Sequence, residues 1–256
     1  MTEFDRQQVV QESHYEFPYH YIPTWDGQRF AQTRNLAWGY EYLSYLQVVM
    51  DTVTRLPFES VLDVGCGDGR FLFELRRRCS AKRLVGLDYS RRAIAYAKAM
   101  APDVEWICGD IRDSEVLDGC FDVVTLVETL EHIKPPELLD FLEGVERRLA
   151  DDGALVVTVP SRNVRVSRKH YQHFDLESLR QVLGPLFTIA DVRYLNRNDG
   201  ASLRWIKVLL SNGLFILNHP GLLRRIYAYY VTHLLPANEG NCRRLAVVCK
   251  KRRASP

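Results

Sequence analysis

The chain has 256 residues, 46% of them hydrophobic and 26% charged, and its formal net charge is +2 at pH 7. These values fit one soluble α/β domain with an insertion, and they exclude a disordered or collagen-like chain. The small net charge gives no reason to expect a nucleic-acid binder. The short basic run 250–253 fits a solvated terminus better than a contact with a polyanion.

Cysteine usage and hydropathy bear on the compartment. The six cysteines form no CxxC pair and lack the spacing of a zinc site, so we expect them to be reduced and mostly buried. Residues 1–11 are polar and charged, unlike a secretory signal, and no apolar stretch of about 18 residues is free of charge. We therefore expect a cytoplasmic protein without a transmembrane helix.

The predicted elements begin after the segment 1–35, which is rich in aromatic and polar residues and contains two prolines. Apolar residues then recur at helical spacing over 36–56. We interpret 1–56 as an N-terminal extension that either closes over the site as a lid or packs against the sheet, and 57–256 as the main domain. The lid interpretation depends on Tyr15, Tyr19, His20, Tyr21 and Trp25.

From residue 57 onward, short apolar strands alternate with helices, which is typical of a parallel sheet covered on both faces. The last two strands are far apart in the sequence and fit an antiparallel pair at one edge. We predict a Rossmann-like, doubly wound, mostly parallel seven-stranded sheet with an antiparallel edge strand. The expected strands are 60–64, 83–87, 104–107, 121–127, 154–159, 187–195 and 244–250, and the expected helices are 70–79, 91–100, one opened by Pro136, and 175–184.

An unusually apolar insertion, 196–242, separates the last two strands. We expect it to form two amphipathic helices, broken near His219. The arginines and the lysine within 203–235 suit an interfacial helix pair beside anionic lipid, so a peripheral membrane contact is one interpretation. Core packing, the wall of an apolar substrate pocket and a homodimer face are the other interpretations of the same stretch.

A glycine-rich turn, 65–69, joins the strand 60–64 to the next helix. Glycines there let the backbone approach a ligand closely, and the helix N-terminus adds unpaired N–H groups. A dinucleotide site has the spacing G-x-G-x-x-G and binds a pyrophosphate. Here the spacing is G-x-G-x-G, and Asp63 and Asp68 disfavour a pyrophosphate but suit a ligand that carries an ammonium and a sulfonium. The turn therefore argues against an NAD-dependent enzyme.

Three further strand ends carry polar motifs in order: Asp88-Tyr89, then Asp110-Ile111, then Glu128. An acid about twenty residues beyond the glycines is placed to accept hydrogen bonds from ribose hydroxyls. Over residues 57–184 this ordered set resembles the class I S-adenosylmethionine-dependent methyltransferases.

The resemblance implies S-adenosylmethionine as cofactor and S-adenosylhomocysteine as product. It implies that Gly65 and Gly67 approach the cofactor and that Asp63 supports the loop and the methionine end. It further implies that Asp88 holds the ribose hydroxyls, Tyr89 lines the adenine pocket, Asp110 reaches the adenine amino group, Ile111 packs on the ring and Glu128 flanks the methionine portion.

The segment 128–132, with the pattern E-x-x-E-H, follows the fourth strand, where an acceptor meets the cofactor. We predict catalytic roles for Glu131, His132 and His173. His132 either accepts a proton near neutral pH or orients the loop. The pattern resembles quinone-biosynthesis O-methyltransferases. It also resembles small-RNA 3′-terminal 2′-O-methyltransferases, which use such residues and a downstream histidine to hold a divalent metal.

A metal at this segment stays an open hypothesis. Glu128, Glu131, His132 and His170 together offer carboxylates and imidazoles suited to Mg²⁺, Mn²⁺ or Zn²⁺. The H-x-x-H stretch 170–173 also matches an ordinary segment of the superfamily. Its histidines therefore have substrate contact and simple packing as alternative roles.

We predict S-adenosylmethionine-dependent methyl transfer to a small-molecule hydroxyl on a natural product, quinone, lipid or sugar. One alternative is a metal-dependent RNA 2′-O-methyltransferase, which the lack of a basic stripe disfavours. Another is a non-catalytic methyltransferase-like partner subunit, against which the intact glycine loop and its acids argue.

Overall fold

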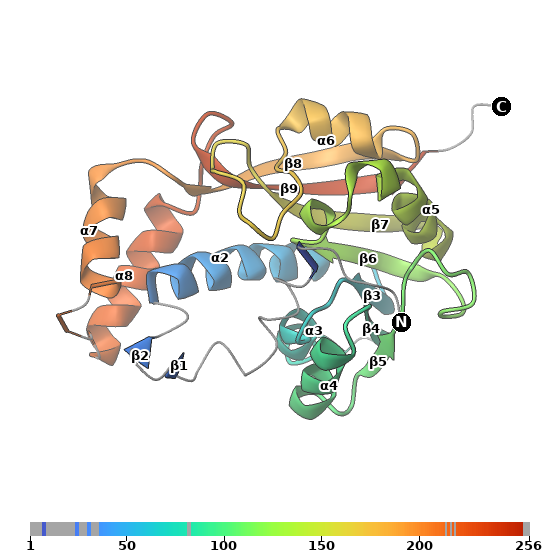
Figure 1. Cartoon of the computed structure of the whole chain (residues 1–256), viewed down its shortest axis with the longest axis horizontal. Helices are drawn as coiled ribbons and strands as arrows, with labels where there is room; N and C mark the ends of the chain where they lie inside the picture. The colour runs from blue at the N-terminus through green and yellow to red at the C-terminus, as the bar shows by residue number, and fades with distance from the viewer. Residues whose placement is uncertain are drawn as a thin grey trace.

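Seven strands form one sheet in the computed structural model, in the order β5-β4-β3-β6-β7-β9-β8 (Figure 1). The structure describes residues 36–80, 83–212, 214–215, 217 and 219–252, together with 7–8, 24–25 and 30–31. The strands are β3 (Ser60–Val64), β4 (Arg83–Asp88), β5 (Glu105–Cys108), β6 (Phe121–Val127), β7 (Leu149–Pro160), β8 (Phe187–Arg197) and β9 (Cys242–Lys251).

The first five strands of this sheet pair in parallel, and β9 runs antiparallel to both β7 and β8. This confirms the predicted mostly parallel sheet and places the antiparallel strand one position in from the edge. The strand order changes direction at β3, which has β4 on one side and β6 on the other. The carboxyl ends of β3 and β6 therefore flank the crevice where ligands bind in open α/β sheets.

Helices cover both faces of the sheet (Figure 1). Apolar side chains of α5 and α6 pack against one face, and those of α2, α3 and α4 pack against the other. Apolar surface is thus removed from water on both faces, as the near-continuous apolar strands require. The bounds are α2 (Leu36–Val53), α3 (Arg70–Leu75), α4 (Arg91–Met100), α5 (Leu138–Arg148) and α6 (Leu176–Leu183), with 3₁₀ turns η1 (Leu130–His132) and η2 (Pro135–Glu137) before α5.

Two element boundaries differ from the prediction by four residues or more. Helix α3 ends four residues early because the chain tightens: the N–H groups of Arg77 and Arg78 donate to carbonyls three residues back. Strand β7 begins at Leu149 rather than at Ala154, because Leu149 pairs with Phe121 across an irregularity in the register. Neither change moves the carboxyl ends of the strands, which carry the candidate site.

The N-terminal segment contributes one small feature to the described part of the chain. Strand β1 (Thr24–Trp25) pairs antiparallel with β2 (Phe30–Ala31). The residues on which the predicted lid depends lie outside the described residues, apart from the backbone of Trp25. The lid therefore stays a prediction.

Two helices occupy the insertion between β8 and β9, namely α7 (Ala201–Leu210) and α8 (Pro220–His233). The break near His219 is where it was expected: the His219 ring accepts a hydrogen bond from the Leu222 N–H, and Pro220 opens the helix. The pair stands beside the N-terminal half of α2 at one end of the molecule (Figure 1). Among the described residues, no helix is long and apolar enough to cross a membrane.

Asn196 joins this helix pair to the rest of the fold. It is fully buried at the end of β8, and its side-chain amide donates to Ser44 Oγ at 2.9 Å and to the Tyr230 hydroxyl at 3.2 Å. Its φ of 59° is in the left-handed region, which asparagine tolerates better than most residues. One amide therefore connects α2, β8 and α8.

We expect Asn196→Ala to lower the free energy of unfolding by about 2–3 kcal/mol, because it removes the amide that donates to the Ser44 and Tyr230 hydroxyls and leaves a residue at a positive φ without that compensation. Tyr230→Phe keeps the ring and removes one of the two bonds, so it should cost only about 1 kcal/mol. Chemical denaturation measures both values. Equal stability of Asn196→Ala and the parent chain would show that this connection is dispensable.

Candidate functional site

The glycine turn after β3 has the shape of a ligand cradle. Gly65, Gly67 and Gly69 all have positive φ values, between 55° and 79°. A Cβ on Gly65 would lie 2.6 Å from the Thr129 methyl group, so only glycine fits there. The loop is also fastened to the neighbouring strand, since the N–H groups of Gly65 and Cys66 both donate to the Leu87 carbonyl. The turn is therefore held open before any ligand arrives.

Two carboxylates border this turn. Asp88 is buried, and its oxygens accept from the Gly67 N–H at 2.9 Å and from the Ser90 N–H at 2.8 Å. Asp63 is buried below the turn, where its carboxylate accepts from the Thr125 hydroxyl at 2.7 Å; burial raises its pKa to about 7. Acids in these positions favour a cationic ligand with hydroxyls over a pyrophosphate, so the donor set fits S-adenosylmethionine.

The residues predicted to surround adenine are in contrasting environments. Tyr89 is 40% exposed beside the turn, as a pocket wall requires. Ile111 is instead buried in the core between the sheet and α5, so the structure does not show it on an open surface. Asp110 binds the Arg112 guanidinium at 2.6 Å, which lowers its pKa and occupies part of its acceptor capacity. Their predicted contacts with adenine stay predictions.

Glu128 belongs to a buried ion network that the sequence did not reveal. One of its oxygens accepts from Arg244 Nε at 2.9 Å, and the same guanidinium binds Glu41 of α2. Arg244 also lies over the Tyr45 ring, 4.1 Å from its centroid. The sequence does contain one indication of it. Arg244 is in the apolar strand β9 and Glu41 is in the apolar helix α2, and a charged side chain in such a place needs a buried partner. Glu128 therefore braces the loop.

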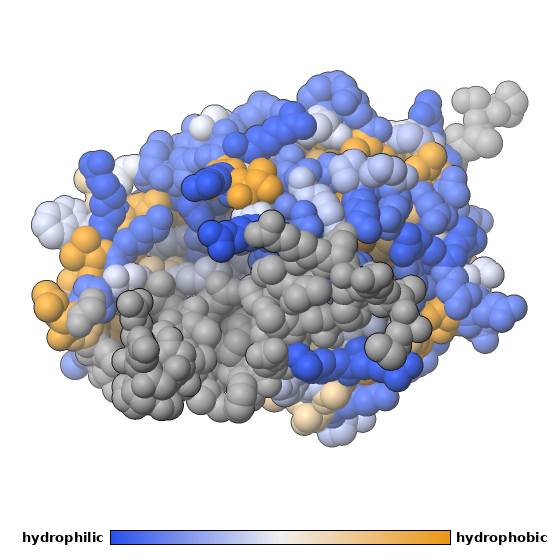
Figure 2. All heavy atoms as spheres, viewed as in Figure 1, coloured by the Kyte–Doolittle hydropathy of each residue, from blue (hydrophilic) through white to orange (hydrophobic). Residues whose placement is uncertain are grey.

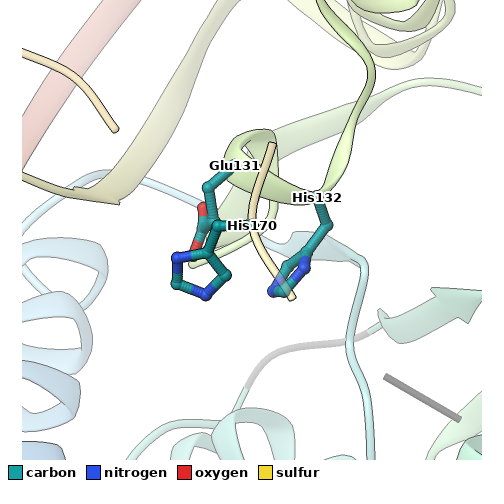
Figure 3. Close-up of side chains that lie close together, drawn as sticks. All are labelled: Glu131, His132 and His170. Carbon is teal, nitrogen blue, oxygen red and sulfur yellow. The ribbon is translucent and has the colours of Figure 1, made fainter. Parts of the chain in front are cut away.

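A second cluster lies immediately after Glu128. Glu131 and His132 belong to the turn η1, and His170 comes from the loop that precedes α6; one ligand atom from each lies within 4.8 Å of the others. Figure 3 shows the three side chains side by side, with His170 arriving from its separate segment. Glu131 is fully buried, and neither of its carboxylate oxygens has a hydrogen-bond partner. Burial and the nearby Glu128 raise its pKa well above the usual value.

Hydrogen bonds to carbonyl groups determine which ring nitrogens carry protons. Because a carbonyl only accepts, the Nδ1 atoms of His132 and His173 donate to the carbonyls of Lys169 and Val164, each at 3.0 Å. In its neutral form His173 then accepts through Nε2 from His170 Nδ1, at 2.8 Å. Burial, followed by the nearby His132, lowers the pKa of His170 to about 2. Neutral His132 and His170 therefore keep Nε2 as the acceptor nitrogen.

His173 lies behind His170 in this arrangement. The ring is only 5% exposed, and its two nitrogens are bonded to Val164 and His170. No ring nitrogen is left to meet an acceptor molecule. His173 is therefore placed to orient His170, and its catalytic role stays a prediction.

The cluster has the donor set of a divalent metal site, although only one carboxylate belongs to it. Among the described residues the grouping comprises Glu131, His132 and His170, whereas Glu128 is engaged by Arg244. Metal-bound histidines commonly donate their second N–H to a carbonyl, as His132 does here. Ligand atoms about 2.1 Å from one ion lie at most about 4.2 Å apart, so a small inward movement completes the set.

Thr129 joins the two halves of the site. Its hydroxyl donates to the Val64 carbonyl at 3.1 Å, and its methyl group lies against Gly65. Thr129 is next to Glu128 and two residues before Glu131, so the histidine-carboxylate cluster begins where the glycine turn ends. A ligand in the turn and a molecule at the cluster are therefore neighbours.

Comparisons with known proteins agree with this geometry. Residues 61–153 match the family model of a methyltransferase domain. The mitochondrial ubiquinone biosynthesis O-methyltransferase of Schizosaccharomyces pombe is 30% identical over 57% of this chain and 58% of its own. The trans-aconitate 2-methyltransferase of Azoarcus sp. is 30% identical over 46% of this chain and 50% of its own. The chain spans about half the length of the curated relatives it matches.

Solved structures show the same fold. The N-methyltransferase NodS from Bradyrhizobium japonicum, in complex with S-adenosylhomocysteine, superposes with a TM-score of 0.60 at 15% identity, over 97% of this chain and 100% of its own. The sheet order, the glycine turn with its bordering acids and the matched domain all agree. Residues 61–153 therefore form a methyltransferase domain, the chain has the fold of S-adenosylmethionine-dependent methyltransferases, and the relatives support S-adenosylmethionine as the cofactor.

Proposed function

We propose that this protein transfers the methyl group of S-adenosylmethionine to a hydroxyl of a small-molecule acceptor and releases S-adenosylhomocysteine. The observation that carries the proposal is the position of His132 and His170 with the buried Glu131, beside the glycine turn. A hydroxyl must lose its proton as it attacks, and this cluster supplies acceptor nitrogens at that place.

The chain's residues bind, orient and accept a proton. S-adenosylmethionine supplies a methyl group on a cationic sulfur. The acceptor oxygen forms a bond to the methyl carbon, the carbon–sulfur bond breaks, and its electron pair stays on sulfur. The hydroxyl proton passes to Nε2 of His132, against whose ring His170 packs. Alignment of the two reactants is the main contribution of the protein.

The donor set supports a second arrangement of the same cluster, in which Glu131, His132 and His170 hold a divalent cation. A buried carboxylate whose oxygens have no partner is costly, and a cation between it and two imidazole acceptors removes that cost. When bound, such a cation lowers the pKa of a coordinated hydroxyl. We favour this arrangement over direct proton transfer to an imidazole.

The relatives support the acceptor class only in part. The Schizosaccharomyces pombe relative is an O-methyltransferase of ubiquinone biosynthesis, whereas NodS is an N-methyltransferase. The RNA 2′-O-methyltransferase alternative shares the cluster. A salt series with RNA tests it, because phosphate contacts make binding fall steeply with salt.

Asp88→Ala should weaken S-adenosylhomocysteine binding by about 1–3 kcal/mol, because the ribose hydroxyls and the Gly67 N–H lose their acceptor. Isothermal titration calorimetry measures the change. Asp140→Ala, at an exposed position of α5, is the matched control and should bind as the parent does. Unchanged affinity in Asp88→Ala would remove Asp88 from the cofactor site.

His132→Ala should lower kcat by about a hundredfold or more, the usual contribution of a positioned proton acceptor, and His170→Ala should lower kcat because it removes the ring that packs against His132. S-adenosylhomocysteine release with a panel of phenolic, sugar, lipid and amine acceptors gives the rates. Cofactor affinity should not change, and His233→Ala on α8 should leave the rates unchanged. Amine acceptors turned over faster than hydroxyl acceptors would contradict O-methylation.

Removal of divalent metal with EDTA should reduce turnover at least tenfold, and added Mn²⁺ or Mg²⁺ should restore it. S-adenosylhomocysteine affinity measured in EDTA should stay as it was, because the glycine turn and Asp88 do not use the metal. Full turnover in EDTA would refute the metal arrangement and leave the imidazoles as direct proton acceptors.

A further inference from the structure

The helix pair α7–α8 has apolar side chains on its outer side as well as its inner side. Leu203, Ile206 and Leu210 of α7 face inward and pack in the same cluster as Tyr230 of α8. On the other side of α7, Trp205 is 68% exposed and Val208 57% exposed. We call the outer set the outer patch; it comprises Trp205, Val208, Leu214, Phe215, Leu222 and Tyr229.

The outer patch includes residues of both helices, and two of them, Trp205 and Tyr229, line the same depression. A depression of about 420 Å³ lies between them and is lined by Trp205 and Ile206 of α7 and by Ile226 and Tyr229 of α8. Leu214, which is 92% exposed, and Phe215 lie in the connection between the helices. Figure 2 shows hydrophobic atoms exposed at the end of the molecule where Figure 1 places this connection. Soluble monomers seldom expose neighbouring large apolar side chains without a binding role.

The charge around the outer patch has one sign. Residues 200–238 contain no aspartate or glutamate, and their four fully charged side chains are Arg204, Lys207, Arg224 and Arg225. All four residues are exposed, and none of them makes an ion pair with an acid in the described part of the chain. Arg225 also lines the depression beside Trp205. The surface therefore combines Trp, Tyr and aliphatic side chains with basic groups.

We propose that the outer patch binds the surface of an anionic lipid membrane, with its apolar side chains in the interfacial region and its basic side chains on lipid headgroups. Amphipathic helices with this combination lie in the plane of the interface. The helices have 10 and 14 residues, shorter than the roughly 20 that a membrane-spanning helix needs.

A second copy of the chain is a poorer occupant of this surface. A two-fold interface places the same patch on both partners. Arg204 and Arg225 would then approach basic side chains of the other copy, and residues 200–238 contain no acid to neutralise them. An anionic lipid surface supplies the missing charge.

A hydrogen bond and two ion pairs connect helix α8 to the candidate site. The Tyr40 hydroxyl of α2 donates to the Leu223 carbonyl of α8 at 2.7 Å. The next residue, Glu41, binds Arg244, which holds Glu128. When α8 is bound to the membrane, it therefore holds α2, and α2 is tied through Arg244 to the loop that begins at Glu128. This arrangement suits an acceptor that resides in or near the lipid. The surface binding itself does not depend on the proposed methyl transfer.

Cosedimentation of the full chain with vesicles tests the proposal. Phosphatidylcholine vesicles that contain phosphatidylglycerol should bind the protein at least tenfold more tightly than phosphatidylcholine alone, and high salt should weaken that binding. Arg204→Glu with Arg225→Glu should reduce binding at least tenfold, since each basic side chain near the surface is worth ~1 kcal/mol. Trp205→Glu with Leu214→Glu should do the same.

Matched controls carry the same changes elsewhere on the surface. Lys98→Glu on α4 and Leu139→Glu on α5, which is 50% exposed, should bind vesicles as the parent does. All variants should keep S-adenosylhomocysteine affinity, which shows that they fold. Equal binding by patch and control variants, or no binding to the anionic vesicle, would overturn the proposal. So would a dimer in sedimentation velocity that Trp205→Glu dissociates, because it would assign the patch to a second copy.

Discussion

The buried guanidinium of Arg244 is the interaction on which the arrangement of the site depends. It binds Glu128 after β6 and Glu41 of α2, and it lies over Tyr45. Burial alone would lower its pKa, but the two carboxylates raise it well above the usual value, so it stays charged. Losing one partner would leave an uncompensated charge in the interior, which is strongly destabilising. One side chain of β9 thereby holds the catalytic loop, α2 and the end of the sheet together.

This network also places Glu128 and Glu131 in different electrostatic environments. Glu128 has a positive φ of 56° and gives one oxygen to Arg244, while Glu131, one turn later, is buried with both oxygens unbonded. The first carboxylate is neutralised by a fixed cation, and the second faces the imidazoles of His132 and His170. A buried carboxyl group without a hydrogen-bond partner and with a raised pKa, beside a cofactor turn, is typical of a functional site rather than of a structural one.

The sequence was sufficient for the sheet, the helix layers and the glycine turn, because these follow from periodicity, caps and glycine spacing. It also identified Glu131, His132 and His170 as neighbours in a hypothesis about metal. It did not predict the Arg244 network, since ion pairs between residues 41, 128 and 244 arise only from tertiary folding. It could not separate the roles of His170 and His173, because two histidines three residues apart cannot be ordered without their hydrogen bonds.

A crystal structure with bound S-adenosylmethionine would test the central claim most directly. The account predicts the methionine end of the cofactor against Gly65 and Gly67, its ribose hydroxyls on Asp88, and its methyl group directed at His132 and His170. A cofactor bound in the turn with its methyl group directed away from Glu131, His132 and His170 would contradict the account, because the proton acceptors would then have no part in the transfer.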